Sequence, residues 1–423
     1  GSSQAAKIQR LLNISYQALP KLKYTTNVSL YYQNKNEIPI ARTVNVIFDR
    51  PAFSLIYYPD GQLTSYIGSK RNPVANALYE TNRTETYSAQ VNNQLDFDIT
   101  KYIKWTTLFN MAYETPQYTF FSPRYVSANK NTNNGINELT KNFRYEAQTY
   151  FNYNQKFKDH TLSATLGANA IRRTQNLFHL EYQNTASEEI NVALPAYLMV
   201  SRSYTSGTAN TNQAIFARVN YDYKSRYYAS AVYRNDGSSR FGPENKRGSF
   251  YSGSVAWRFS AEKIMEWSRN ILDDAKIRAS YGRVGNDQIE DFGSITKVQF
   301  EGNYNGVGGA SYNTTIGNSL IKWETGIQKN LGLDLNFLKG RLTFTGEIYE
   351  KESKDLLYQR QLVKETGFST VIVNVGSTVN KGIEFTLSGT PIAKKNFTWN
   401  VDANIYFESG TNKELAGAVP FIA

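Results

Sequence analysis

The most constraining feature of this 423-residue chain is a series of segments in which apolar and polar residues alternate, repeated from Gln9 to Phe407. Successive side chains of a β-strand point to opposite faces, so each segment predicts a strand with one apolar and one polar face. About fourteen such segments follow one another, most of them about ten residues long or longer. In the last segment every second residue is apolar: Phe397, Trp399, Val401, Ala403, Ile405 and Phe407.

The connections between these segments are alternately short and long. Short connections lie at about 19–21, 157–160, 224–226, 338–340 and 392–395, and long ones at about 34–85, 115–141, 174–211, 286–323 and 352–380. Loops beyond about 15 residues are uncommon in compact domains, whereas outer-membrane barrels combine short periplasmic turns with long extracellular loops. The sequence therefore predicts an all-β fold, a transmembrane antiparallel β-barrel with about 14 strands in this chain.

Composition agrees with a strand-built membrane protein. The mean hydropathy is −0.51 and no apolar run approaches the roughly 18 residues of a membrane helix, but only alternate residues of a barrel strand face lipid. The chain has 31 tyrosines and 23 phenylalanines, and aromatic residues gather in girdles at both membrane interfaces. The net charge of +11 indicates anionic neighbours, and the scattered basic residues form no nucleic-acid motif. A positive barrel lumen and contact with acidic outer-leaflet lipid are the two interpretations that remain.

Charged residues of the predicted strands fall mainly on the polar register, which we expect to face the barrel lumen. A lipid-facing Arg or Lys near the bilayer midplane would cost roughly 2–4 kcal/mol. The charged residues assigned to the lumen are Arg144, Glu146, Arg218, Asp222, Asp334, Arg341, Glu347, Glu384 and Asp402.

One connection departs from the alternation of short and long connections. The segment 261–272 places Ile264, Trp267, Ile271 and Leu272 near helical spacing and predicts a short interfacial helix at the periplasmic side.

Several motifs in the second half of the chain resemble one known family. They are DGSSRFG at 236–242, SVAWRFS at 254–260, KIRASYGRVGN at 276–286, LDLNF at 333–337 and NVGSTVNKGIE at 374–384. Their order and spacing, over about residues 230–408, resemble the barrel of SusC/RagA-type TonB-dependent transporters. The earlier part is similar more loosely, through the strand rhythm and Asn72-Pro73.

The resemblance implies an outer-membrane importer of the Bacteroidetes with a barrel of about 22 strands, a size associated with a plugged lumen. It also implies two partners, the periplasmic energy-transducing protein TonB and a SusD-like surface lipoprotein, and oligosaccharide or peptide substrates. Residues 1–423 are expected to be a partial TonB-dependent receptor β-barrel domain, with the plug domain and the closing C-terminal strands absent. Open strand edges are strongly unfavourable in lipid, so we expect this segment alone to form no working pore.

Catalytic chemistry is not indicated by the sequence. His160 and His179 are far apart and have no evident nucleophile beside them, and the chain has no cysteine. The segment 236–239 predicts a tight loop between two strands, because a nucleophile elbow would lead from a strand into a helix. We therefore expect no enzyme, no metal site and no cofactor.

Ligand binding is a better interpretation of the aromatic residues near the outward strand ends. Aromatic faces with amide neighbours suit sugar or peptide ligands, since the ring covers apolar C–H surface while polar neighbours donate and accept hydrogen bonds. The candidate contacts are Tyr57, Tyr58, Tyr118 and Phe121.

Other interpretations remain open at this point. A siderophore or cobalamin receptor would share the barrel architecture, although the motif series favours the nutrient importer. An adhesin or a secretion-channel barrel would need no import machinery. A soluble carbohydrate-binding β-protein is the fourth alternative, and it would be extracted without detergent.

Overall fold

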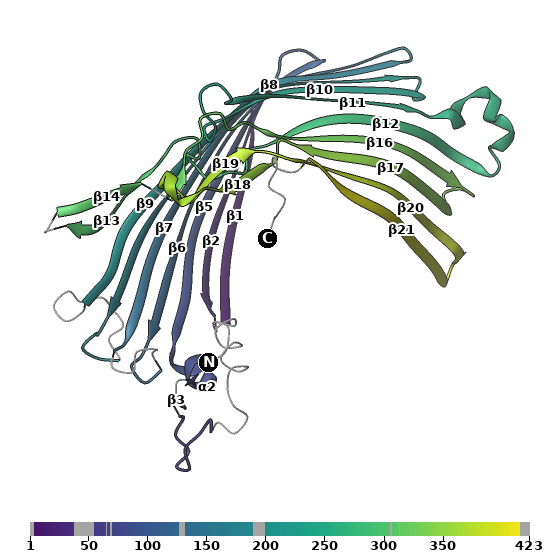
Figure 1. The fold of residues 1–423 in the computed structure, drawn as a ribbon. Coiled ribbons are helices and arrows are strands. Elements are labelled where there is room, and N and C mark those ends of the chain that lie inside the picture. The colour runs from purple at the N-terminus through teal and green to yellow at the C-terminus, as the bar shows by residue number, and fades with distance from the viewer. Residues whose placement is uncertain are drawn as a thin grey trace. The chain divides into compact units, whose positions relative to one another are not determined.

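The computed structural model describes residues 4–37, 55–64, 66–67, 70–126, 132–188, 199–304, 307–312 and 314–414. Fourteen strands form one sheet and pair in the order in which they occur along the chain (Figure 1). The strands are β1 (Gln4–Leu19), β2 (Leu22–Asn36), β5 (Thr81–Asp98), β6 (Ile103–Ser122), β7 (Asn134–Phe157), β8 (His160–Gln183), β9 (Met199–Tyr223), β10 (Tyr227–Ser238), β11 (Arg247–Trp257), β12 (Leu272–Asn286), β16 (Glu324–Phe337), β17 (Leu342–Lys354), β20 (Ser377–Lys394) and β21 (Phe397–Glu414). The predicted antiparallel meander of about fourteen strands is thus confirmed.

The loops that join these strands carry small elements of their own. Two-stranded pairs are formed by β3 (Tyr66–Ile67) with β4 (Lys70–Arg71) and by β13 (Val298–Tyr304) with β14 (Val307–Tyr312). A three-stranded sheet contains β15 (Thr315–Ile316), β18 (Leu357–Gln361) and β19 (Thr370–Asn374), and a 3₁₀ turn, η3 (Lys364–Thr366), lies between the last two. The described residues also contain an α-helix, α2 (Pro73–Tyr79), which begins at Asn72, whose side chain accepts a hydrogen bond from the Val74 amide at 3.0 Å. None of the helices in the described residues has the length and apolarity needed to cross a membrane.

The predicted alternation of connection lengths is confirmed. Two to four residues separate the strands at 20–21, 99–102, 158–159, 224–226, 338–341 and 395–396, whereas the connections at the other strand ends are longer. At the turn 224–226, Lys224 and Ser225 have φ of 55° and 51°, the left-handed conformation that matches the twist of a tight hairpin. The long-connection ends are the extracellular side by the rule for outer-membrane barrels.

The chain divides into two compact units. The first contains residues 1–95, 108–146 and 172–209, and the second contains 96–107, 147–171 and 210–423. In the first unit, β1 and β2 pair so that Leu12 faces Val28 and Tyr16 faces Tyr24. In the second, Leu331 of β16 faces Ile348 of β17, which faces Ile383 of β20.

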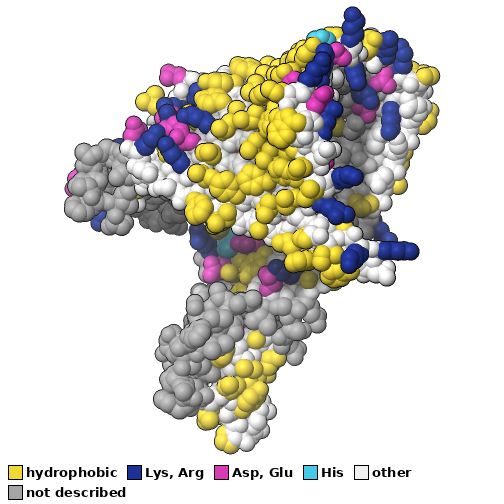
Figure 2. All heavy atoms as spheres, turned by 90° about the vertical axis from the view of Figure 1, so that its right-hand side faces the viewer, with side chains coloured by type: hydrophobic (Ala, Val, Ile, Leu, Met, Phe, Trp, Pro, Cys, Tyr) yellow, Lys and Arg dark blue, Asp and Glu magenta, His cyan; other side chains and the backbone are white. Residues whose placement is uncertain are grey.

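Apolar side chains of both units lie exposed on one face of their strands. Figure 2 shows hydrophobic side chains gathered in a broad band with Lys and Arg at its borders. Large apolar residues such as Leu12, Val255 and Phe407 are 54–61% exposed, which in water would favour aggregation but is the property of a lipid-facing wall. On the other face Arg278 contacts both Asp334 at 3.3 Å and Glu347 at 2.5 Å. These contacts confirm that Asp334 and Glu347 lie on the polar face to which the sequence assigned them.

Strand lengths differ from the prediction at three long loops and one turn. β6 continues to Ser122, β7 begins at Asn134, β8 reaches Gln183 and β9 begins at Met199, so the connections 115–141 and 174–211 were predicted too long. The connection 352–380 shortens to 355–376 because β17 and β20 are longer than predicted. The predicted turn 392–395 is shifted to 395–396, since a bulge between Gly389 and Ile392 changes the register of β20 with β21.

The predicted interfacial helix is a pair of 3₁₀ turns, η1 (Phe259–Ala261) and η2 (Lys263–Ser268), between β11 and β12. Ile264 and Trp267 are both 79% exposed. Glu262 joins the two turns and accepts hydrogen bonds from the Tyr227 hydroxyl at 2.7 Å and the Trp257 indole at 3.3 Å. These bonds, the Tyr227 bond first, hold the pKa of the Glu262 carboxyl below its ordinary value.

Candidate functional site

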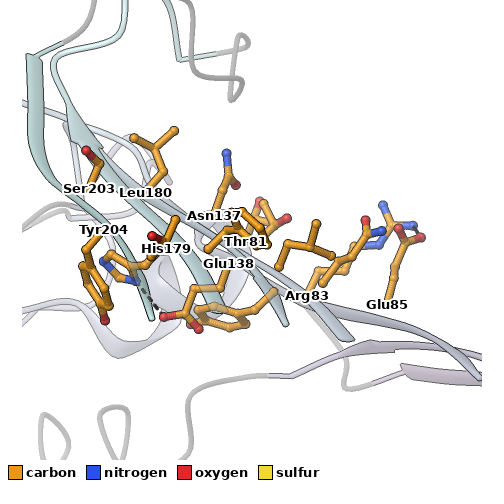
Figure 3. Close-up of a pocket in the computed structure, with 15 residues that line it drawn as sticks. Thr81, Arg83, Glu85, Asn137, Glu138, His179, Leu180, Ser203 and Tyr204 are labelled. Carbon is orange, nitrogen blue, oxygen red and sulfur yellow. Dashed lines mark hydrogen bonds and ion pairs between the residues drawn. The ribbon is translucent and has the colours of Figure 1, made fainter. Parts of the chain in front are cut away.

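A cavity of about 920 Å³ lies at the extracellular ends of β5 to β9, within the first unit (Figure 3). Five neighbouring strands contribute to its lining, with hydroxyl and amide groups, three aromatic rings and one ion pair. Cavities of this size with a few placed polar groups are typical of small-molecule sites. The lining residues lie at 81, 83, 85, 117–119, 137–139, 178–180 and 203–205.

The most ordered part of the cavity is a contact between three strands. The His179 Nδ1 atom of β8 lies 2.7 Å from the Glu138 Oε1 atom of β7, and the His179 ring stacks on Tyr204 of β9 at 4.6 Å. The His179 side chain is only 9% exposed, and Figure 3 shows it between Glu138 and Tyr204. Its Nε2 atom is buried and has no hydrogen-bond partner within the described part of the chain. A hydroxyl or amide of a ligand would satisfy that nitrogen.

The remaining lining residues supply complementary chemistry. Arg83 and Glu85 of β5 form an ion pair, and the Tyr32 hydroxyl of β2 donates to Glu85 at 3.2 Å. Arg202 lies over the Tyr204 ring at 4.8 Å from its centroid, so that ring already has a cation on one face. Rings, amides and fixed charges together suit a polar ligand with apolar C–H surface, such as a sugar or a peptide.

The four residues predicted as ligand contacts lie in three different places. Tyr118 of β6 lines the cavity. Phe121, three residues further along β6, is only 3% exposed and belongs to the packed interior. Tyr57 and Tyr58 are 53% and 48% exposed in a short reversal in which the Tyr58 amide donates to the Gln62 carbonyl at 2.7 Å. The structure therefore brings one of the four to the cavity.

The sequence reasoning missed His179, Glu138 and Tyr204. It assigned His179 to the long connection 174–211, although β8 continues to Gln183. The available signal was the position of His179 in a segment that still alternates, since Phe178 and Leu180 flank it.

The DGSSRFG motif of the second unit forms a hydrogen-bonded network instead of a cavity lining. Arg240 Nε donates to Asp291 at 2.9 Å, and the Ser238 hydroxyl donates to Asp287 at 2.8 Å. Phe241 is 1% exposed and its ring lies 5.1 Å from that of Trp323. The motif therefore fastens the β10–β11 loop to the segments after β12 and before β16. Strands flank the motif on both sides as expected, but the tight loop predicted at 236–239 is wrong, because β10 continues to Ser238 and the connection to β11 spans 239–246.

No group of three or more His, Cys, Asp or Glu side chains that would hold a metal ion occurs among the residues for which the structure gives positions. Charge at the two clusters above is balanced by direct ion pairing, as at Arg83 with Glu85 and Arg240 with Asp291.

Comparisons with known proteins agree with this architecture. Residues 23–420 match the family described as TonB dependent receptor-like, beta-barrel. A TonB-dependent receptor of Formosa agariphila is 30% identical over 377 residues, which cover 88% of this chain and 36% of the relative. The TonB-dependent receptor SusC of Bacteroides thetaiotaomicron is 33% identical over 217 residues, 50% of this chain and 22% of that protein.

The solved structure of the RagAB peptide transporter has a TM-score of 0.87 at 20% identity, and the similarity covers 98% of this chain and 47% of that one. This chain spans less than half the length of the relatives that it matches. The strand rhythm, the loop alternation, the motif series and these similarities agree with one another. The chain belongs to the β-barrel family of the TonB-dependent receptors of the outer membrane and is of their SusC/RagA type.

Proposed function

We propose that the protein to which this chain belongs imports nutrients, oligosaccharides or peptides, across the outer membrane. The chain supplies barrel wall and extracellular loops, as a segment of a barrel of about 22 strands with a plugged lumen. The observation that carries the proposal is the cavity of about 920 Å³ at the extracellular strand ends, where rings, amides and an imidazole nitrogen that has no partner among the described residues converge. Membership of the receptor family and the relatives named SusC and RagAB support the same function.

Substrate contact is assigned to two tyrosines of the cavity, Tyr118 and Tyr204. Tyr57 and Tyr58 are proposed as additional contacts on the exposed loop, and Phe121 as an apolar support beneath the rim of β6. The partners proposed are TonB, as the energy source, and a SusD-like surface lipoprotein that captures the substrate. No enzymatic step is part of the proposal.

The partner proposal is tested by isolating the full-length protein from outer membranes in mild detergent and identifying its companions by mass spectrometry. A stoichiometric SusD-like lipoprotein is the expected result. Recovery of the barrel without any such lipoprotein would contradict the nutrient-importer proposal and direct the search to a siderophore receptor or to a surface protein without import.

The site proposal is tested by replacing Tyr118 and Tyr204 with alanine in the full-length protein. Loss of each ring is expected to weaken substrate binding by about threefold to tenfold. A glycan or peptide that binds is first selected from mixtures, and its dissociation constant is then measured by calorimetry. Tyr251→Ala is the matched control, because Tyr251 is a 48% exposed tyrosine of the lipid-facing register of β11. Unchanged binding by both cavity variants, with normal folding, would exclude the cavity as the substrate site.

A further inference from the structure

A cluster of three charged side chains lies on the apolar face of the second unit, whereas most charged residues of the strands lie on the polar face. Lys329 of β16, Glu350 of β17 and Lys381 of β20 are directly opposite one another in register. The Lys329 Nζ atom lies 2.8 Å from Glu350, and the Lys381 Nζ atom lies 3.0 Å from the same carboxylate. Both lysines remain more than half exposed, so one carboxylate joins two accessible ammonium groups.

The neighbouring positions on the same face form an apolar groove. Leu331, Ile348 and Ile383 are the next outward residues of the same three strands, one step toward the short turns, and Phe407 of β21 lies beside Ile383. With Lys329 and Lys381 they line a hollow of about 670 Å³. The hollow therefore has an aliphatic and aromatic half and a cationic half.

The cationic half lies at the height of the outer-leaflet headgroups. β16 and β17 are joined by the short turn 338–341, which marks their periplasmic ends. Lys329 is eight residues from Phe337 along β16, and a strand rise of about 3.3 Å per residue with a tilt of about 40° gives a height of roughly 20 Å. The apolar belt of an outer-membrane barrel is about 25 Å tall, so the Lys329 backbone lies roughly 5 Å inside its outer border, and the long lysine side chain brings the ammonium group to that border.

The charged residues around the groove give the outer border of the apolar belt a positive net charge. One strand step further out, Glu352 of β17 pairs with Lys354 at 3.4 Å and with Lys413 of β21 at 3.2 Å. Four lysines thus surround two glutamates, and the group carries a net charge of about +2 at neutral pH. Each ammonium group has three N–H donors, so the pairing with glutamate leaves donors for an anion.

We propose that this groove binds an outer-leaflet lipid with a phosphorylated headgroup. The phosphate contacts Lys329 and Lys381, while an acyl chain lies along Leu331, Ile348, Ile383 and Phe407. The apolar half of the groove opens on the face that lies against lipid, where a soluble anion or a peptide has no route of approach. Glu350 holds the two ammonium groups at one height, so the phosphate meets a fixed pair of cations instead of two mobile side chains.

The experiment titrates the full-length receptor in detergent with monophosphoryl lipid A and with its dephosphorylated form, using native mass spectrometry to count bound lipid. The expected result is preferential binding of the phosphorylated lipid. In Lys329→Gln/Lys381→Gln that binding is about 30-fold weaker, because two lysine charges next to an anionic headgroup are lost. Lys329→Arg/Lys381→Arg retains the charge and is expected to retain binding.

The matched control is Lys351→Gln. Lys351 is the residue after Glu350 in β17, so its side chain points to the opposite face of the sheet at the same height. Equal binding of the two lipid forms by the wild-type receptor would overturn the proposal, as would an effect of Lys351→Gln equal to that of the double glutamine variant. Complete displacement of the lipid by inorganic phosphate would identify a free-anion site and would also overturn it. If the glutamine variant does not fold, the comparison of the two lipids on the wild-type receptor decides.

Discussion

The Phe250 ring occupies a slot that two glycines leave open on the polar face of the second unit. A Cβ atom added to Gly285 of β12 would overlap the end of this ring, and one added to Gly248 of β11 would meet it as well. The ring is only 7% exposed and is backed by Trp323, whose ring centroid lies 5.5 Å away. We predict that Gly285→Ala destabilises the barrel, since a buried ring backed by Trp323 must shift to admit the added methyl group.

The size of the effect is set by comparison with a second glycine. At Gly253 of β11 the nearest atom to an added Cβ is the Ser230 carbonyl oxygen at 3.6 Å, an ordinary contact. Gly253→Ala is expected to be neutral or to stabilise by about 0.4–1 kcal/mol, because alanine has less conformational freedom in the unfolded chain. Overpacking at Gly285 costs about 1–3 kcal/mol, so the two identical substitutions should differ by about 1–4 kcal/mol in the free energy of unfolding.

The assay is urea unfolding of the full-length receptor in detergent micelles, followed by tryptophan fluorescence and by heat-modifiable mobility on gels. Gly285→Ala/Phe250→Leu provides the double-mutant cycle, and the smaller side chain is expected to restore much of the lost stability. Equal unfolding midpoints for Gly285→Ala and Gly253→Ala would refute the steric argument. A double variant less stable than the sum of the two single changes would refute it as well.

Three further predictions concern charge and hydrogen bonding. Arg240→Ala should lower the free energy of unfolding by about 2–3 kcal/mol in the same urea assay, since the 10% exposed Asp291 side chain loses its cation. The folded-state pKa of Glu262 is lowered, chiefly by the hydrogen bond from Tyr227, so its contribution to stability is present above the ordinary carboxyl pKa and is lost as pH falls through the folded value. The unfolding midpoint of Glu262→Gln should therefore depend less on pH below the ordinary carboxyl pKa than that of the wild type. His179→Ala should weaken substrate binding by about threefold to tenfold in calorimetry, because the ligand loses its bond to the Nε2 atom.

The strands within the apolar belt were predictable because alternation is a direct consequence of the pleat when one face meets lipid. Leu331, Leu333 and Leu335 therefore marked β16 with the correct register. Beyond the belt both faces of a strand are wet and the contrast disappears, so the outer ends of β6 to β9 were read as loop. The cavity around His179 lies there, and for that reason sequence reasoning found only Tyr118 of its lining.

Contacts between strands that are distant in the sequence were also not predictable from the alternation. The alternation placed charges on the polar register, but it gave no reason to expect Lys329, Glu350 and Lys381 opposite one another on the apolar one. Their significance depends on the pairing of three strands that are separated by up to 52 positions in the chain. The spacing near 3.6 at 261–272 likewise could not distinguish an α-helix from 3₁₀ turns, because the helical part, η2, has only six residues.

The exposed η2 turn also bears on how the receptor adjusts to bilayer thickness. Trp267 and Ile264 stand out at the periplasmic end of the wall, where indole rings favour the headgroup zone. Such an anchor resists vertical displacement, so hydrophobic mismatch is not shared equally between the two leaflets. Lipid thinning or thickening around this protein is therefore concentrated at the outer leaflet, close to the loops that meet the extracellular medium.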